Sequence, residues 1–261
     1  MDDYGECVLN DDQTTGPCPA RGHLFVETGL RVTEYSRATG SPVRHWTLTS
    51  AAAPVTAAGL DVVGGTVWAW TDWATDGSGF QYAQIDRIQT SSPAVHVVDK
   101  DAFPGDMSAD GAGLYFETVR GTTDDLALAS PTTSAVRYRK APVDAPLALA
   151  GGRVDLLSFG ASTADVLSYN ASTLALVSAK RVPETDGSIS GTGLGLLVLN
   201  QPCRAFPCSA ATVGRLNPAT GATTGALSVP GGYQLLDGPA VIEASSVHGT
   251  RANLFLVRLS S

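Results

Sequence analysis

A strand pattern that recurs along the whole chain is the feature that most constrains the fold. Its clearest copy spans residues 193–238, and it contains apolar or alternating runs at 194–199, 211–216, 223–229 and 233–236. Turn residues such as Asn217, Pro218 and Gly221 separate these runs. Short apolar runs bounded by Gly, Pro and Asn predict β-strands joined by tight turns.

Five further groups of short runs repeat this pattern. The expected strands are 23–28, 30–35 and 42–48; 55–63, 66–71, 81–88 and 94–98; 106–112, 114–119, 125–129 and 135–140; 146–150, 153–159, 165–169 and 174–182; and 233–237, 239–245 and 253–259, with 187–193 completing the copy described above. The second strands begin at His23, Thr66, Gly113, Arg153, Leu194 and Pro239, so successive spacings are 43, 47, 40, 41 and 45 residues. A period of about 40–50 residues with four strands per repeat is typical of a β-propeller.

The predicted fold class is therefore all-β, as a single β-propeller domain over residues 1–261. Six four-stranded blades are expected, with boundaries near residues 22, 59, 111, 151, 191 and 238. At five of these joins the chain is expected to reverse at glycines, namely Gly59, Gly111, Gly151, Gly191 and Gly238. The last group lacks its outermost strand, so we expect residues 5–10 to pair with 253–259 and close the ring. Seven blades are the alternative if the chain is a fragment.

Two turns share a sequence motif. Ser36-Arg37-Ala38-Thr39-Gly40 matches Asn217-Pro218-Ala219-Thr220-Gly221, and Asn170-Ala171-Ser172-Thr173 lies in register with them without the glycine. Gly40 and Gly221 stand where a hairpin loop commonly requires a positive φ.

A strand followed by a D/N-x-x-T-G turn resembles the PQQ-like, or quinoprotein-type, propeller repeat of exported bacterial proteins. Proteins with such repeats include quinoprotein dehydrogenases, assembly scaffolds and sensor ectodomains. In the dehydrogenases a tryptophan recurs in the outer strand of successive blades. Here Trp46 holds that place, whereas Val97, Tyr138, Val177 and Leu227 stand near the others. This departure argues against quinone chemistry, and fold resemblance by itself does not assign a function.

Charge and hydropathy restrict the possible partners. The chain carries 17 Lys and Arg against 25 Asp and Glu, a net charge of −8, which predicts no nucleic-acid partner. No apolar run approaches the roughly 20 residues that span a bilayer, so we expect no membrane insertion. The acidic start Met1-Asp2-Asp3-Tyr4 is unlike a signal peptide.

Four cysteines fall into two local pairs, Cys7 with Cys18 and Cys203 with Cys208. Neither pair has the spacing of two to four residues that zinc sites prefer, and few histidines lie near. Two loop-stapling disulfides are predicted, with zinc or free thiols as the alternatives. Disulfides favour an oxidising compartment, so an extracellular or cell-surface location is expected.

The most unusual composition lies between Val67 and Tyr82, which holds three of the four tryptophans. Trp68 and Trp70 share one strand face and are expected in the core between blades. Trp73 follows them, and with Asp72, Asp76 and Tyr82 it forms a candidate ligand-binding surface. Exposed aromatic rings beside carboxylates stack on sugars and accept their hydroxyls. The alternative interpretation is that these residues serve only packing and turns.

Aspartates near turns raise a calcium hypothesis. Asp99, Asp101, Asp106 and Asp110 precede Gly111, but only Asp99-Lys100-Asp101 has the alternation of a calcium loop, with a lysine between the acids. Ordinary Asx-turns explain them better. No metal and no cofactor are predicted.

The segment 201–208 interrupts a hairpin that other groups close more simply. Arg204 and Phe206 lie at its expected tip, and both residue types favour interface centres, so the segment is a candidate partner loop. A merely stabilised loop is the alternative.

Sequence features of catalysis are weak. The four histidines are scattered, and the letters Gly187-Ser188-Ile189-Ser190-Gly191 lie among strands rather than before a helix. The predicted function is a non-enzymatic binding module that recognises a protein or glycan, within a larger assembly or as a sensor ectodomain. The alternatives are a quinoprotein-like or lyase/lactonase-like enzyme with its site at the central channel, and a purely structural spacer.

Overall fold

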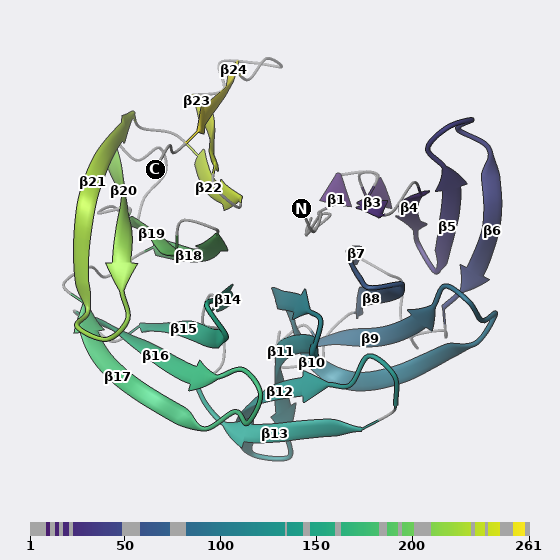
Figure 1. Cartoon of the computed structure of the whole chain (residues 1–261), viewed down its shortest axis with the longest axis horizontal. Coiled ribbons are helices and arrows are strands. Elements are labelled where there is room, and N and C mark those ends of the chain that lie inside the picture. The colour runs from purple at the N-terminus through teal and green to yellow at the C-terminus, as the bar shows by residue number, and fades with distance from the viewer. Residues whose placement is uncertain are drawn as a thin grey trace. The chain divides into compact units, whose positions relative to one another are not determined.

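The described part of the chain is built from β-strands. The computed structural model describes residues 9–10, 14–15, 18–20, 23–48, 58–73, 82–133, 135–142, 147–159, 163–182, 187–192, 195–200, 210–230, 233–237, 240–245 and 253–258. Their strands form five antiparallel sheets, which confirms the predicted all-β class (Figure 1). None of the described residues belongs to a helix with the length and apolarity needed to cross a membrane. The chain divides into two compact units, Met1–Val143 and Asp144–Ser261.

The first unit contains two sheets. One is formed by β1 (Leu9–Asn10), β2 (Thr14–Thr15), β3 (Cys18–Ala20), β4 (His23–Thr28), β5 (Arg31–Ser36) and β6 (Pro42–Thr47). The other follows chain order through β7 (Ala58–Val63), β8 (Thr66–Trp73), β9 (Tyr82–Gln89), β10 (Val95–Asp110), β11 (Gly113–Arg120), β12 (Thr123–Ala129) and β13 (Val136–Lys140).

The second unit contains three sheets whose strands also pair in chain order. Two of them have four strands: β14 (Leu147–Ala150), β15 (Arg153–Phe159), β16 (Ala164–Asn170) and β17 (Leu176–Val182), then β18 (Gly187–Thr192), β19 (Gly195–Asn200), β20 (Ala210–Asn217) and β21 (Ala222–Pro230). The third has β22 (Tyr233–Asp237), β23 (Ala240–Ser245) and β24 (Asn253–Arg258). The predicted strands agree closely with these bounds. Leu9 and Asn10 pair with Thr15 and Thr14, while the pairing of residues 5–10 with 253–259 would join the two units and stays a prediction.

Strand β10 differs from the prediction. The sequence predicts separate strands at 94–98 and 106–112, but one strand runs from Val95 to Asp110. Its first part pairs with β9 and its second part with β11, and Ala102 pairs with both Ala83 and Thr118. The register shifts on both sides of Ala102. These irregularities let the strand change partner without ending, because bulges bend a strand while pairing continues.

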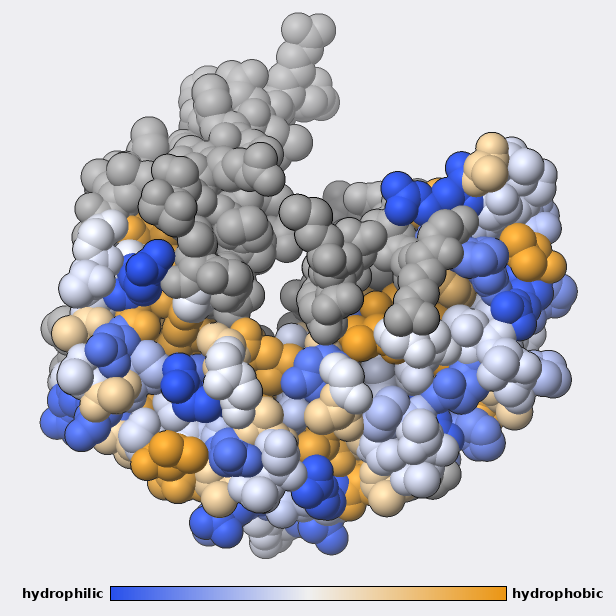
Figure 2. All heavy atoms as spheres, viewed as in Figure 1, coloured by the Kyte–Doolittle hydropathy of each residue, from blue (hydrophilic) through white to orange (hydrophobic). Residues whose placement is uncertain are grey.

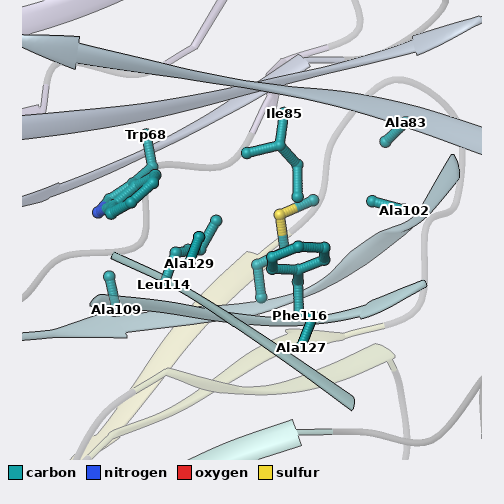
Figure 3. Packing of buried hydrophobic residues seen from close by; sticks show 10 residues of the cluster. Trp68, Ala83, Ile85, Ala102, Ala109, Leu114, Phe116, Ala127 and Ala129 are labelled. Atoms are coloured by element: carbon teal, nitrogen blue, oxygen red, sulfur yellow. The ribbon is translucent and has the colours of Figure 1, made fainter. Parts of the chain in front are cut away.

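Strand β8 is buried on both faces. Val67 and Ala69 pack into a cluster with Phe25 and Trp46 of the preceding sheet. Trp68, on the opposite face, is 1% exposed. Its cluster joins the two parts of the seven-stranded sheet: Figure 3 shows Trp68 and Ile85 on one side of the packed layer and Leu114 and Phe116 on the other.

The predicted packing role of the tryptophan pair is therefore confirmed. Trp68 lies in the core, and Trp70 packs half-buried against the same cluster. A β-strand buried on both faces lies between two packed layers, since its side chains alternate.

The second unit is packed in the same way. Apolar side chains of β14–β17, including Val166 and Val182, meet side chains of β18–β20, including Ile189, Val198 and Leu216, in one buried cluster. Consecutive four-stranded sheets of this unit therefore bury apolar faces against each other.

Two glycines predicted at chain reversals lie inside strands instead. Gly59 belongs to β7 and pairs with Trp70, and the chain reverses at Gly64 and Gly65. The Trp70 indole lies 2.2 Å from where a Cβ at residue 59 would be, so Gly59 makes room for this ring. Gly191 likewise lies in β18 and pairs with Leu196.

Four turns share one hydrogen-bonding scheme, namely β5–β6, β12–β13, β16–β17 and β20–β21. In each of them a threonine Oγ1 accepts the N–H two residues later at 3.2–3.3 Å: Thr39 from Ser41, Thr133 from Ala135, Thr173 from Ala175 and Thr220 from Ala222. Gly40 and Gly221 have φ of 69° and 74°, as the motif predicts. Leu174 takes the glycine position of its turn with φ of 55° and is 2% exposed. Burial of its side chain offsets the left-handed backbone, a cost of about 1–2 kcal/mol.

Within the first unit, two turns accept hydrogen bonds from side chains of strands that come earlier in the chain. The indole N–H of Trp46 in β6 donates to the backbone oxygen of Ser92, in the β9–β10 turn, at 2.8 Å. Arg87 of β9 donates to the backbone oxygen of Ser130, in the β12–β13 turn, at 3.1 Å. The partners are 46 and 43 residues apart, which is one period of the predicted repeat.

The second unit has the equivalent contact. The Ser178 hydroxyl of β17 donates to the backbone oxygen of Pro218, 40 residues away in the β20–β21 turn, at 3.2 Å. Beside it, a Cβ at Gly221 would lie 2.4 Å from the backbone oxygen of Arg181. Glycine therefore lets this turn approach the outer strand of the preceding sheet.

Candidate functional site

An open pocket of about 650 Å³ lies in the first unit. It is lined by residues 97–101 of β10, by 118–121 at the β11–β12 hairpin, and by Tyr138 of β13. Part of the lining is the stretch of β10 where this strand exchanges its pairing with β9 for pairing with β11. The irregular strand thus contributes polar side chains to this pocket.

Asp99 is a hydrogen-bond acceptor in the lining of the pocket. Its Oδ1 accepts the backbone N–H of Asp101 at 2.8 Å, and the Thr118 hydroxyl lies 3.1 Å from this oxygen and 3.0 Å from the Asp101 backbone oxygen. A hydroxyl has one hydrogen, so Thr118 donates to one of these oxygens at a time. Burial raises the pKa of Asp99 and outweighs these hydrogen bonds, which lower it.

Arg120 and Tyr138 form a stacked pair in the lining of the same pocket. The guanidinium carbon of Arg120 lies 4.0 Å from the centre of the Tyr138 ring. Its Nη1 is 3.8 Å from Oδ2 of Asp125, beyond ordinary hydrogen-bond distance. Burial, and then the nearby charge of Asp99, raise the pKa of Tyr138, while Arg120 lowers it. The phenol is therefore neutral near pH 7 and able to donate or accept a hydrogen bond.

The pocket combines both charges with an aromatic ring. Asp99 and Asp101 supply carboxylates, and Lys100 and Arg120 supply exposed cations. Such a lining suits a polar ligand with several hydrogen-bonding groups rather than an apolar one. In the part of the chain that the structure describes, no cluster of three or more His, Cys, Asp or Glu side chains is placed to hold a metal ion.

The predicted ligand-binding residues lie elsewhere in the same sheet. Asp72 and Trp73 end β8, where they pair with Ala83 and Tyr82. Tyr82 is half-buried, and its ring meets Phe103 edge-on, with 6.3 Å between centroids. The fold thus brings Trp73 and Tyr82 opposite each other on neighbouring strands.

Several predictions fall outside the described residues. Asp76 and the partner-loop residues Arg204 and Phe206 are among them. The proposed disulfides also depend on residues beyond this part of the chain, namely Cys7, Cys203 and Cys208; Cys18 begins β3.

The Asx-turn interpretation is confirmed for two of the four aspartates, Asp99 and Asp110. Asp99 accepts the N–H of Asp101, and Asp110 accepts those of Ala112 and Gly113 at 2.8 and 3.3 Å. The pocket itself was not predicted. Its one signal in the sequence was the alternation Asp99-Lys100-Asp101 between two apolar runs, whereas Arg120 and Tyr138 come from distant segments.

No protein-family model matches the chain, and a search of curated proteins gives no match. On the face seen in Figure 2, hydrophilic and hydrophobic residues of the described part are interspersed rather than gathered by kind.

Proposed function

We propose that the chain is one β-propeller of six four-stranded blades, closed by residues 5–10 pairing with 253–259. Sheets whose strands pair in chain order support this architecture, as does the burial of apolar faces between consecutive sheets. Further support comes from hydrogen bonds between neighbouring layers whose partners are 46, 43 and 40 residues apart. Contacts at one period of the sequence are expected when identical units stack in order.

The same proposal includes export, with disulfides Cys7–Cys18 and Cys203–Cys208 stapling two loops. Small loops closed by disulfides are stable in oxidising compartments. A PQQ-like repeat family remains the proposed relationship, and it rests on the Thr-Gly turn motif of residues 36–40 and 217–221.

The proposed function is non-enzymatic recognition of an extracellular protein or glycan, as part of a larger assembly or as a sensor ectodomain. The observation that carries it is the pocket lined by Asp99 and by Arg120 stacked on Tyr138. Its volume lies within the range of about 300–1,000 Å³ that is common for ligand sites. The end of β8 with Trp73, and the loop with Arg204 and Phe206, are proposed as further contact surfaces.

A capture experiment tests this function. Wild-type protein is immobilised beside Tyr138→Ala, Trp73→Ala and the double variant Arg204→Ala/Phe206→Ala, and each is exposed to a glycan microarray and to native extracellular proteins. We expect wild type to capture a ligand and Tyr138→Ala to lose it while its circular dichroism and unfolding remain cooperative. Equal capture by all variants, or by none of the proteins, would contradict the binding function at these surfaces.

A further inference from the structure

Arg120 is the strongest candidate anchor for an anionic group in the described part of the chain. It is 54% exposed, and its guanidinium stacks on Tyr138 at 4.0 Å. Among the described residues its nearest carboxylate is Asp125 at 3.8 Å, and it donates no hydrogen bond to any of them. Stacking fixes the plane of the guanidinium, and its N–H groups stay available for a bidentate contact with an acid group.

Lys100 adds a second exposed cation to the lining of the pocket. It is exposed, and it lies on β10 while Arg120 lies on β11. Two cations in the lining favour a ligand with an anionic group over a neutral ligand.

The two aspartates restrict how much negative charge can enter. Asp99 and Asp101 line the same hollow, so a doubly charged phosphate or a run of peptide carboxylates meets repulsion that a single negative charge meets only in part. Carboxylate oxygens are also strong acceptors for hydroxyl groups. A ligand with one negative charge and several hydroxyls satisfies both sets of side chains.

We propose that this pocket binds a sugar residue that carries one singly charged acid group, a carboxylate or a sulfate. Arg120 and Lys100 hold the acid group, and Asp99 and Asp101 accept hydroxyls of the ring. The proposal rests on the binding function above and names the ligand class for the Tyr138 pocket. The volume of about 650 Å³ accommodates one or two sugar residues with their water.

Calorimetric titration with defined trisaccharides tests the proposal. The probes are a trisaccharide of two glucose residues and one glucuronic acid residue, the neutral glucose trisaccharide of the same linkage, a singly sulfated glucose trisaccharide and a Glu-rich peptide. The variants are Arg120→Gln and, as a matched control, Arg139→Gln, which removes an exposed cation of β13 that does not line the pocket. Thermal unfolding of each variant checks that it is folded.

We expect an acidic trisaccharide to bind at least about tenfold more tightly than the neutral one, with Arg120→Gln removing most of that preference. Arg139→Gln should change the affinity less than about twofold, since exposed charges act weakly at a distance. The arm that binds more tightly, uronate or sulfate, identifies the acid group.

Three results would overturn the proposal. They are equal affinity for acidic and neutral sugars, equal losses in the two arginine variants, or tighter binding of the Glu-rich peptide. If Tyr138→Ala loses a captured ligand while no acidic sugar binds, the ligand class is wrong and the binding function stands. If nothing is captured by wild type, the binding function itself fails.

Discussion

In each of the two units, a strand side chain donates a hydrogen bond to a later turn, but the donor residue differs. In the first unit, β6 presents Trp46, which is 2% exposed and donates to Ser92 in a turn of the next layer. In the second unit, β17 presents the smaller Ser178, which donates to Pro218 in the corresponding turn. There Gly221, which has no side chain, lets the turn approach the backbone oxygen of Arg181 closely.

The hydrogen bond to the turn recurs in both units, whereas the residue that donates it differs. A large aromatic side chain reaches the neighbouring turn in one interface, whereas a small hydroxyl and a close backbone approach do so in the other. The scarcity of outer-strand tryptophans in the sequence therefore does not mean that the other sheets lack docking contacts.

Trp46→Ala should break the first interface most strongly. Truncating a buried tryptophan removes its packing against Phe25 and leaves a cavity, so we expect a loss of about 3–5 kcal/mol in the free energy of unfolding. Urea unfolding followed by circular dichroism measures it. Trp46→Phe keeps much of the buried volume and should lose about 1–2 kcal/mol. An alanine variant as stable as wild type would contradict the packing role.

Gly221→Ala should break the second interface, with Gly40→Ala as its matched control. Both glycines have positive φ, but a Cβ at Gly40 meets open space, whereas one at Gly221 meets the Arg181 backbone oxygen. We expect about 1 kcal/mol of destabilisation for Gly40→Ala and about 2–4 kcal/mol for Gly221→Ala in chemical unfolding. Equal losses would show that close approach plays no part.

Asp61→Asn tests a third contact, inside the seven-stranded sheet, where a carboxylate of β7 accepts a hydrogen bond from β10. Asp61 accepts the backbone N–H of Ala109 at 2.7 Å, and burial raises its pKa from 3.8 to about 6. Because this pKa is raised in the folded state, wild type loses stability as pH rises from about 4 to about 6 and stays at the lower value above that range.

Asparagine retains an oxygen for Ala109 without the charge. We therefore expect Asp61→Asn to be more stable than wild type at pH 7, by at most about 3 kcal/mol, and nearly equal to it near pH 4. Thermal unfolding across this pH range measures the difference. A gap that is the same at both pH values would rule out ionisation of Asp61 as its source.

Ser178→Ala should give the smallest effect. It removes one partly buried hydrogen bond to Pro218, worth about 0.5–1.5 kcal/mol. Combined with Gly221→Ala, its loss should be smaller than alone, because the displaced turn no longer offers the acceptor. A double-mutant cycle in urea tests this coupling, and strict additivity would speak against a shared interface.

The strand positions could be predicted from the sequence because the patterns that indicate them are local. Runs of alternating or apolar residues bounded by Gly, Pro and Asn give strand bounds within a few residues, and Thr-Gly pairs give the turns. Leu174 escaped prediction because its side chain is buried well enough to hold a left-handed backbone that normally needs glycine. The prediction that the chain reverses at Gly59 was wrong. A glycine is needed there because the Trp70 indole of the neighbouring strand occupies the space of a side chain.

The pocket could not be predicted for a related reason. Its lining joins Asp99, Thr118, Arg120 and Tyr138 from three strands, and their meeting depends on the continuous, irregular path of β10. Periodicity shows which residues face a core, but it does not show where a strand exchanges one pairing partner for another.

Hydrogen exchange at the Trp46 indole N–H tests the docking of consecutive sheets most directly. The indole resonance is assigned in an NMR spectrum by its disappearance in Trp46→Phe, and its exchange with deuterium is followed at constant pH. If Trp46 donates to Ser92 across a buried interface, exchange should be slowed by orders of magnitude relative to free indole and should require opening of the two layers. Exchange at the rate of an exposed tryptophan would contradict the docking of these sheets.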